Sequence, residues 1–500
     1  MLDKMRLRND RLFDFVVSDD DAAKMIRNGM TVACGGFTST GSPKAVPLAL
    51  VRLIERGQEI KINLLSGGSV GPEVENELAR VGAIVRRSPG TRAVYSHMIR
   101  GINNGDIAYN DNHYSHMAQM MDCGFFGPID VAIIEAIAIT PEGHVIPASS
   151  VGGSPILARL AKKVIVEVNT TQPLELEGIH DIYIPDKPPY RKPIPIHHAG
   201  DRIGTPYIEV GLQNISAIVE SNFGEASSKF SEPDEKSKRI ADYLIDFLQA
   251  EVRSGRLPRT LLPLQSGVGN ISNAVLAGLS KSDFNQLEFY TELIQPSVID
   301  MIDSGKVKVA SCSAFPPDPG VVERLQGDFQ RYRNSFILRP LDISNSPEVI
   351  RRLGVIALNT PLEVDIYGHA NSTHIMGTKM VNTIGGSGDF MRNGYLSIFT
   401  TTSTTKDDTI SRIVPMVSHV DHTEHDWHVL ITENGIGDLR GLSPRERAKT
   451  LINNCAHPQY RPLLLDYFKR AEKLKGHSPH NLKEALAWHV RYLETNTMMI

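Results

Sequence analysis

Residues 31–55 read TVACGGFTSTGSPKAVPLALVRLIE and contain, in order, an apolar strand, a glycine-rich turn and a helix. The strand covers Thr31 to Cys34 and the helix covers Ala45 to Glu55. Strands that alternate with helices predict parallel α/β packing. Further apolar strands of this kind are expected at Ile60 to Leu65, Ala83 to Val85, Val131 to Glu135 and Val164 to Val168.

The second half of the chain repeats this order of elements. SGVGN, residues 266–270, opens a helix, and LEFYTE, residues 287–292, reads as the next strand. A helix at residues 298–303 then leads to a strand at residues 307–311. Because the period exceeds about 200 residues, a duplicated α/β unit fits better than a short solenoid repeat.

We therefore predict an α/β fold made of two tandem, related, open α/β domains, residues 1–228 and 229–500. The boundary falls in the polar segment FGEASSKFSEPDEKSK, residues 223–238. Ligands of open α/β sheets bind beyond the carboxyl ends of the strands. The glycine-rich turns and Glu292 lie at such ends, so we expect one active site in a cleft between the two domains.

Composition and charge exclude several classes of protein. The 53 basic and 57 acidic residues leave a formal charge of −4, and their scatter along the chain does not indicate a nucleic-acid-binding surface. The cysteines, Cys34, Cys123, Cys312 and Cys455, form no CxxC pair, which disfavours a disulfide framework and a zinc knuckle. No stretch resembles a secretory signal or a membrane span. We expect a cytoplasmic protein, or a protein of the organellar matrix if the source is eukaryotic.

Two glycine clusters in the second half could bind a ligand. They are QSGVGN, residues 265–270, and NTIGGSGD, residues 382–389. Glycines let backbone N–H groups approach a ligand, and two amides that converge on one oxygen make an oxyanion hole. A simple turn is an equally good interpretation of each cluster. Neither has the GxxxxGK[ST] or the strand-GxGxxG-helix context, which disfavours nucleoside triphosphate and NAD sites.

Two carboxylates stand where apolar strands end. Glu292 follows LEFYT, and Glu433 lies in LITENGI, residues 430–436. A carboxylate at a strand exit is typical of a pocket, because burying it without a partner costs several kcal/mol. An exposed glutamate without a function is the alternative for each, and spacing alone does not choose between them.

A run of four histidines invites a metal interpretation. They are His419, His422, His425 and His428. Their spacing is neither HExxH nor a closed ligand set, and no cysteine lies nearby before Cys455. We expect a histidine-rich loop and no metal site.

The first glycine turn resembles the N-terminal signature of the class I CoA-transferases, with Asn28-Gly29, then Val32-Ala33-Cys34, then GGF and Gly41-x-Pro43. Cys34 departs from that pattern, in which an aliphatic residue is usual. The second half resembles the acetyl-CoA hydrolase/transferase family, including its succinyl-CoA:acetate and propionyl-CoA:succinate CoA-transferases. Its matching motifs are PLQSGVGN (263–270), YTE (290–292), SNSPEVIRRLG (344–354), IYGHANST (366–373), IGGSGDF (384–390) and ENGIGDLRGLSP (433–444).

This resemblance, which covers essentially the whole chain, implies the class I CoA-transferase fold and a homodimer. It makes Glu292 the nucleophile, because the family carries that residue in a Y-[ST]-E segment, and it leaves Glu433 as a supporting active-site residue. It places Asn345 near the reacting carboxylates and assigns the oxyanion hole to the amides of Val268 and Gly386. The implied coenzyme A contacts are Leu264, Gln265, Ser266, Gly267, Val268, Gly269, Asn382, Gly386 and Lys406.

The activity expected from this resemblance is transfer of coenzyme A between small carboxylic acids such as acetate, propionate and succinate. The reaction would pass through an acyl-glutamyl anhydride and a glutamyl-CoA thioester, with no cofactor beyond coenzyme A itself. An acetyl-CoA hydrolase with the same glutamate is one alternative, and a non-catalytic acyl-CoA or sugar-phosphate sensor is another. Relatives that use succinate place a basic residue near the segment that here reads SNFGEA, residues 221–226, so succinate is favoured only weakly.

Overall fold

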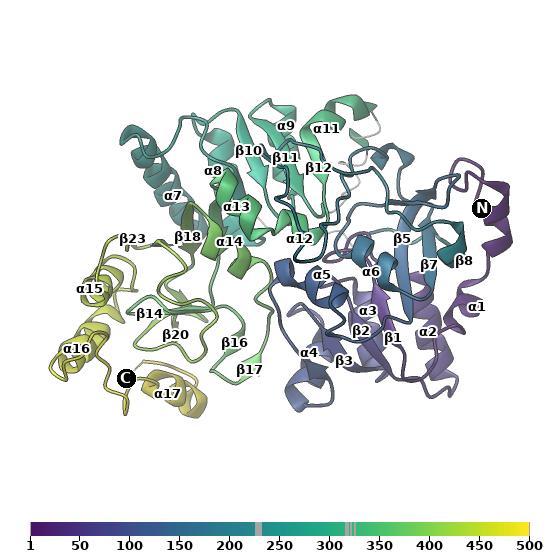
Figure 1. Ribbon diagram of the computed structural model, residues 1–500. Coiled ribbons are helices and arrows are strands. Elements are labelled where there is room, and N and C mark those ends of the chain that lie inside the picture. Colours follow the sequence, from purple (N-terminus) through teal and green to yellow (C-terminus); the bar gives the residue numbers. More distant parts are fainter. Residues whose placement is uncertain (1, 226–232, 316–319, 321–322, 325–326, 500) are drawn as a thin grey trace. The chain divides into compact units, whose positions relative to one another are not determined.

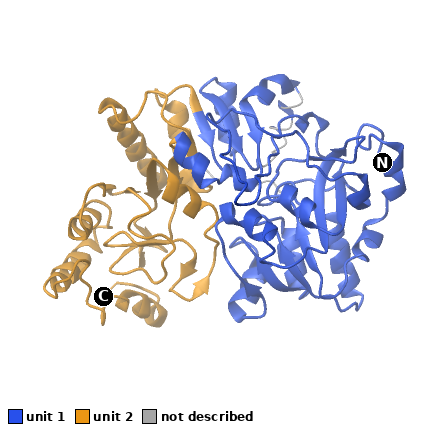
Figure 2. Cartoon of the chain, viewed as in Figure 1, with its two compact units in different colours: residues 1–229, 288–353 blue, residues 230–287, 354–500 orange. Residues whose placement is uncertain are grey.

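Two compact units make up the chain (Figures 1 and 2). Unit 1 consists of Met1–Lys229 and Glu288–Leu353, and unit 2 of Phe230–Leu287 and Gly354–Ile500. Each unit is therefore assembled from two separate stretches of sequence. This computed structural model describes residues 2–225, 233–315, 320, 323–324 and 327–499.

A mostly parallel sheet forms the centre of unit 1. Its strands follow the order β4-β3-β2-β1-β5-β7-β8, and β6 pairs antiparallel with β5. The strands β5 and β7 are buried along their whole length and are almost entirely apolar, as expected for strands covered on both faces. The strands are β1 (Thr31–Cys34), β2 (Ile62–Leu65), β3 (Ile84–Ser88), β4 (Ala108–Tyr109), β5 (Val131–Ile139), β6 (Val145–Pro147), β7 (Val164–Asn169) and β8 (Ile215–Ser221).

Helices pack against this sheet in two groups (Figure 1). α1 to α4 share one apolar core with side chains of β1, β2, β3, β5, β7 and β8. α5 and α6 pack against each other, and α6 also packs against β5 and β1. The helices are α1 (Asp19–Ala23), α2 (Ala45–Glu55), α3 (Pro72–Arg80), α4 (Ser96–Asn104), α5 (Tyr114–Asp122) and α6 (Ser154–Leu160), with 3₁₀ helices η1 (Asp10–Phe15), η2 (Leu174–Leu176) and η3 (Leu212–Asn214).

Residues 288–353 complete unit 1 by pairing with the loop after β6. The amide of Val151 donates to the carbonyl of Ser313 at 2.9 Å, and the amide of Leu341 donates to the carbonyl of Gly152 at 2.9 Å. These bonds join segments that are more than a hundred residues apart in sequence. The elements are β10 (Leu287–Tyr290), α9 (Pro296–Asp303), β11 (Val307–Cys312), α11 (Phe329–Ser335), β12 (Phe336–Leu338), α12 (Leu341–Ser344) and α13 (Pro347–Leu353).

A buried arginine fastens this second stretch to the first. Arg339 follows β12 and is fully buried. Its guanidinium donates to the carboxylate of Asp181, to the carbonyl of Asp201 and, at 2.7 Å, to the hydroxyl of Ser311. Several charged and polar partners around one guanidinium make up for the water it loses on burial.

Unit 2 is built around the strand order β9-β13-β18-β22-β23, in which only β23 is antiparallel. β9 pairs with β13, the fourth strand after it in the chain, just as β1 pairs with β5, the fourth strand after it. This shared connection agrees with the predicted duplication of an α/β unit. The strands are β9 (Leu264–Ser266), β13 (Ile356–Asn359), β18 (Leu396–Thr400), β22 (Val429–Thr432) and β23 (Gly435–Asp438).

Helices and three small sheets complete unit 2. The sheets are β15-β14-β21, β16-β17 and β19-β20. Their strands are β14 (Glu363–Asp365), β15 (Ala370–Asn371), β16 (His374–Ile375), β17 (Lys379–Met380), β19 (Thr404–Thr405), β20 (Ile410–Ser411) and β21 (Ile413–Val414). The helices are α7 (Glu235–Arg253), α8 (Asn270–Lys281), α14 (Ser387–Asn393), α15 (Pro444–Asn454), α16 (Arg461–Glu472) and α17 (Ala487–Thr495).

The predicted α/β class with parallel sheets is confirmed. The predicted boundary between residues 228 and 229 lies outside the described residues, and the sequence domains 1–228 and 229–500 stay a prediction. Across the described part of the chain, no helix has both the length and the apolar character that a bilayer crossing requires.

We expect Arg339→Met to lower the free energy of unfolding by about 3–5 kcal/mol, because the carboxylate of Asp181 would stay buried without its charged partner. Urea denaturation followed by tryptophan fluorescence and circular dichroism measures the loss. Arg80→Met is the matched control, since Arg80 pairs with Glu77 and Glu55 on the surface. A loss in Arg339→Met no larger than in this control would contradict the role given to Arg339.

Candidate active site

Glu292 lies in unit 1, two residues beyond the end of β10. Pro296 starts α9 two residues after Ile294, so the chain must turn between strand and helix, and Glu292 stands in that turn. The backbone carbonyl of Glu292 accepts from the amides of Ser313 and Ala314, at 2.8 and 3.1 Å. The backbone is thus fixed while the side chain stays half-buried.

Asn345 faces this carboxylate. Its Nδ2 donates to Oε1 of Glu292 at 2.5 Å, and Asn345 itself is fully buried at the end of α12. The hydroxyl of Ser344 lies 2.9 Å from Oδ1 of Asn345. The hydroxyl of Tyr290, on the strand that leads to Glu292, donates to the carbonyl of Ile343 at 2.5 Å and ties β10 to α12. Glu292 and Asn345 therefore lie within hydrogen-bonding distance of each other, and their roles in catalysis stay predictions.

An apolar cluster lies beside the nucleophile candidate. Phe37, Tyr114, Ala314 and Leu341 pack together, with Leu293 against them. The rings of Phe37 and Tyr114 meet edge to face, with centroids 5.6 Å apart. Burial, and then the negative charge of Glu292, raise the pKa of Tyr114 well above its usual value, so its phenol stays neutral. Phe37, which belongs to the predicted N-terminal signature, thus contributes to the surroundings of Glu292.

The loop that carries Phe37 is held by buried charges that the sequence analysis missed. Nζ of Lys44 contacts Oε2 of Glu135 at 2.7 Å, and Glu167 accepts the first amides of α2, including that of Lys44 at 2.8 Å. Glu225 accepts from the amide of Gly41 at 2.8 Å. Burial raises the pKa of Glu135 to about 8. A glutamate inside each of two apolar strands, VAIIEAIAI and VIVEVN, was the available signal.

The glycine turn after β9 lies in unit 2. Gln265 is buried, and its Oε1 accepts from the amide of Leu358 and from Nδ2 of Asn359, both at 3.0 Å. Val268 is exposed at the turn, and Gly269 has φ of 122°, a conformation that favours glycine. The turn lines a hollow of about 260 Å³, whose walls also include Thr360, Thr402 and Arg412. The predicted residues Leu264, Ser266 and Gly267 belong to the same strand and turn.

The second glycine cluster precedes α14. Gly386 is buried and caps the helix, and its φ is −86°. Asn382 is exposed, and its amide donates to the carbonyl of Thr373 at 3.2 Å. Gly386 and Val268 are both in unit 2, but the pairing of their amides as an oxyanion hole stays a prediction.

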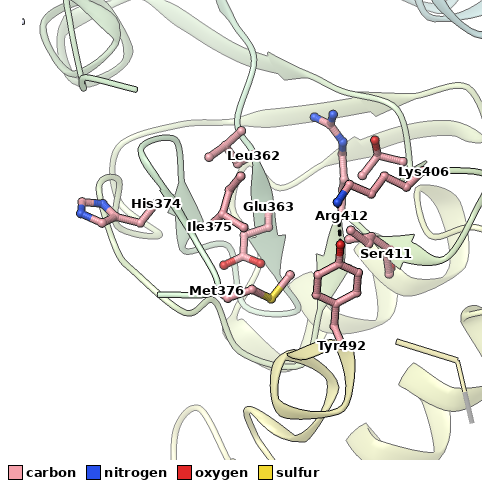
Figure 3. Close-up of a pocket in the computed structure, with 11 residues that line it drawn as sticks. Leu362, Glu363, His374, Ile375, Met376, Lys406, Ser411, Arg412 and Tyr492 are labelled. Carbon is pink, nitrogen blue, oxygen red and sulfur yellow. Dashed lines mark hydrogen bonds between the residues drawn. The ribbon is translucent and has the colours of Figure 1, made fainter. Parts of the chain in front are cut away.

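Lys406 lines a different cavity, of about 200 Å³ (Figure 3). Its Nζ donates to the hydroxyl of Tyr492 at 2.6 Å. Arg412 lines both this cavity and the hollow beside Val268, and burial lowers its pKa. Arg412 was not predicted from the sequence, although a basic residue directly before the apolar pair Ile413-Val414 was a signal for it. The remaining walls of the cavity are Leu362, Glu363, His374, Ile375, Met376, Thr405, Ile410 and Ser411.

Glu433 occupies a different environment from Glu292. It is buried at the end of β22, and its carboxylate accepts from the amide of Ser403 at 2.8 Å and from its hydroxyl at 2.6 Å. Nδ2 of Asn434 also donates to the Ser403 hydroxyl, at 2.9 Å. The carboxylate therefore fixes the loop after β18. Its part in catalysis stays a prediction.

The histidine-rich segment forms several separate contacts. His422 is buried with Nε2 2.9 Å from the hydroxyl of Ser387, and Nδ1 of His428 accepts from the amide of Ser397 at 3.0 Å. Within the residues that the structure describes, no three histidine, cysteine or acidic side chains are grouped so that they could hold a metal ion.

Two family models match the chain. The model of the acetyl-CoA hydrolase/transferase N-terminal domain matches residues 2–220, and that of the corresponding C-terminal domain matches residues 323–468. Among curated proteins, the chain is 50% identical to a succinyl-CoA:acetate CoA-transferase of Clostridium kluyveri, over 99% of this chain and 92% of that one. It is 44% identical to an acetyl-CoA hydrolase of Schizosaccharomyces pombe (99% and 98% covered) and to a propanoyl-CoA:succinate CoA transferase of Escherichia coli (96% and 98% covered).

Solved structures share the fold at low sequence identity. RipA from Yersinia pestis superposes with a TM-score of 0.72 at 22% identity, covering 93% of this chain and 98% of that one. A 4-hydroxybutyrate CoA-transferase from Porphyromonas gingivalis superposes with a TM-score of 0.64 at 21% identity, covering 92% and 98%.

We expect Glu433→Ala to lower the free energy of unfolding by about 1–3 kcal/mol, because the buried amide of Ser403 would lose its acceptor. Glu433→Gln keeps one acceptor oxygen for that amide and should recover most of the loss. Urea denaturation of both variants measures the difference. Equal losses in the two would show that hydrogen bonding to Ser403 is not what the carboxylate supplies to the fold.

Proposed function

Because this chain belongs to the acetyl-CoA hydrolase/transferase family, we propose that it is a CoA-transferase that moves coenzyme A between short-chain carboxylic acids, with Glu292 as the nucleophile. The observation that carries the proposal is the hydrogen bond from Asn345 to the half-buried carboxylate of Glu292. A neutral amide orients the carboxylate without adding a positive charge to it. The amide thereby holds Glu292 in one orientation, and the proposed attack uses the carboxylate in its anionic form.

The first half of the reaction transfers the acyl group. An oxygen of Glu292 attacks the thioester carbonyl carbon of the donor, a C–O bond forms, the C–S bond breaks, and the coenzyme leaves as a thiolate. We assign the developing oxyanion to the amides of Val268 and Gly386. The product is a mixed anhydride between the acyl group and Glu292.

The second half moves the coenzyme to the enzyme. The thiolate attacks the glutamyl carbonyl carbon of the anhydride, a C–S bond forms, and the acyl group leaves as a free carboxylate. Glu292 then carries coenzyme A as a thioester. An acceptor carboxylate runs the same steps backwards, so the thioester bond is conserved and the transfer needs no ATP.

Conservation of the thioester requires that water be kept from Glu292. The apolar cluster of Phe37, Tyr114, Leu341 and Ala314 supports this requirement, because it surrounds one side of the nucleophile with side chains that supply no general base. Excluding water also strengthens each hydrogen bond to the transition state.

Coenzyme binding is proposed for unit 2. The strand and turn 264–269, with Asn382, Gly386 and Lys406, are the proposed contacts. The hollow beside Val268 and the cavity beside Lys406 offer space for parts of so long a ligand. Contacts far from the thioester contribute to rate when they become fully formed in the transition state.

Hydrolysis is the second candidate function, because curated relatives include acetyl-CoA hydrolases. The same glutamate would form the same anhydride, and water would then replace the acceptor. Acetate, propionate and succinate are the proposed acids. The homodimer and the cytoplasmic location stay predictions.

We expect acetyl-CoA alone, without an acceptor acid, to add the mass of coenzyme A, less that of one water, to the peptide that contains Glu292. Peptide mass spectrometry after rapid acid quenching locates the adduct. Glu292→Ala should form no adduct and no product, whereas Asn345→Ala should retain activity reduced about tenfold to a hundredfold, as expected for loss of a hydrogen bond to a charged group.

Glu288→Gln provides the matched control for Glu292→Ala. Glu288 lies on β10, the strand that leads to Glu292, and pairs with Lys308 near the surface at 3.4 Å. The Glu288→Gln variant should form the adduct on Glu292 at the wild-type rate. An adduct on another residue, or full activity in Glu292→Ala, would refute the mechanism.

The rate at which free thiol is released distinguishes a transferase from a hydrolase. For a transferase, we expect slow thiol release from propionyl-CoA in buffer alone, and fast formation of acetyl-CoA once acetate is added, because the acceptor carboxylate captures the enzyme thioester. Thiol titration with an aromatic disulfide and chromatography of the acyl-CoA species measure the two rates. Fast thiol release that acetate does not change would favour the hydrolase.

A further inference from the structure

The loop that carries Lys406 has an unusual backbone. Lys406, Asp407 and Asp408 have φ of 52°, 53° and 63°, although none of them is glycine. Three consecutive residues in the left-handed region are strained, and strained backbone persists only where its surroundings hold it. Such residues gather at ligand sites, which raises the question of what holds this loop.

Contacts from distant elements of unit 2 hold the loop. The carbonyl of Asp408 accepts from the hydroxyl of Tyr460 at 2.9 Å, and the carboxylate of Asp408 pairs with Lys236 at 3.1 Å. The carbonyl of Thr409 accepts from the amide of Met498, close to the C-terminus, at 2.8 Å. The β19–β20 hairpin is therefore braced by the final segment of the chain.

The C-terminal helix α17 is itself fixed by a buried pair. Nε2 of His489 lies 2.8 Å from Oε2 of Glu363, and both side chains are buried. Glu363 also accepts from Nδ2 of Asn371 at 2.9 Å and from the hydroxyl of Ser418 at 2.7 Å. Residues three apart share one face of a helix, so this anchor at His489 aims Tyr492 in a defined direction.

Tyr492, oriented in this way, contacts the ammonium group of Lys406. Its hydroxyl accepts from Nζ at 2.6 Å, and Nζ lies 5.2 Å from the centre of its ring. Figure 3 shows the two side chains meeting at the wall of the cavity. An ammonium has three donors, so two of them stay available for an anionic ligand.

We propose that Tyr492 is a positioning residue for coenzyme binding, and that α17 thereby forms part of the coenzyme site. This inference rests on the proposed function, in which Lys406 contacts the coenzyme. A lysine side chain is long and flexible, and ordering it on binding reduces affinity. Tyr492 holds the ammonium before the ligand arrives, so the phosphate groups of coenzyme A meet a cation that is already in place.

The test compares two donors. Acetyl-CoA carries the phosphates, whereas acetyl-pantetheine lacks the nucleotide and its phosphates. We expect Tyr492→Phe, which keeps the ring and loses the hydroxyl, to raise KM for acetyl-CoA about threefold to tenfold, the usual effect of one hydrogen bond. KM for acetyl-pantetheine should not change. An equal rise for both donors would overturn the proposal, because it would indicate general damage to the enzyme.

A double-mutant cycle supplies the second readout. Calorimetry gives the Kd of free coenzyme A for wild type, Tyr492→Phe, Lys406→Met and the double variant. The tyrosine exchange should weaken binding in the wild type and should have no effect once Lys406 is methionine, because the two residues act as one unit. Additive effects would overturn the proposal.

Tyr395→Phe is the matched control. Tyr395 lies in the same unit and its hydroxyl donates to the carbonyl of Arg256 at 3.1 Å, so its exchange removes the same kind of bond elsewhere. Coenzyme affinity should not change in this variant. Equal affinity of Tyr492→Phe and wild type would overturn the role of Tyr492 alone, whereas a wild type that binds no coenzyme A would overturn the proposed function and this inference with it.

Discussion

Residues 288–353, which carry both Glu292 and Asn345, pack on a loop of the first half of the chain. The backbone hydrogen bonds Val151–Ser313 and Gly152–Leu341 fix the position of residues 288–353 on this loop. No other residue fits at Gly152, since a Cβ there would lie 2.0 Å from the carbonyl oxygen of Gly36. Tight backbone packing at this point therefore helps to position the stretch that carries the candidate site.

Much of this architecture could be predicted from local sequence. β1 and α2 have the predicted bounds, because an apolar run, a glycine turn and a helical pattern are local signals. β10 ends two residues earlier than predicted, since the chain must turn before Pro296. Glu292 was one of two candidates, and only the resemblance to a family selected it.

The features that could not be predicted depend on contacts between distant residues. Lys44 and Glu135 are 91 residues apart, and Lys406 and Tyr492 are 86 residues apart. A glutamate inside an apolar strand marks Glu135, but nothing in the local sequence identifies the partner in either pair. The structure also gives a physical reason to distinguish the two strand-end glutamates, since the carboxylate of Glu433 accepts from a backbone amide and holds a loop, whereas that of Glu292 meets a side-chain amide beside an apolar wall.

Because unit 1 consists of two separate stretches of sequence, it cannot be completed early during synthesis on the ribosome. Its sheet is complete in sequence by β8, yet the strand leading to Glu292 and the helix carrying Asn345 are translated only after a further stretch that belongs to unit 2. The surface of the first half that residues 288–353 cover therefore stays exposed until residue 353 has left the exit tunnel. Long-range contacts of this kind slow folding and expose apolar surface in the meantime. The proposed nucleophile and its hydrogen-bond partner are thus assembled late in synthesis.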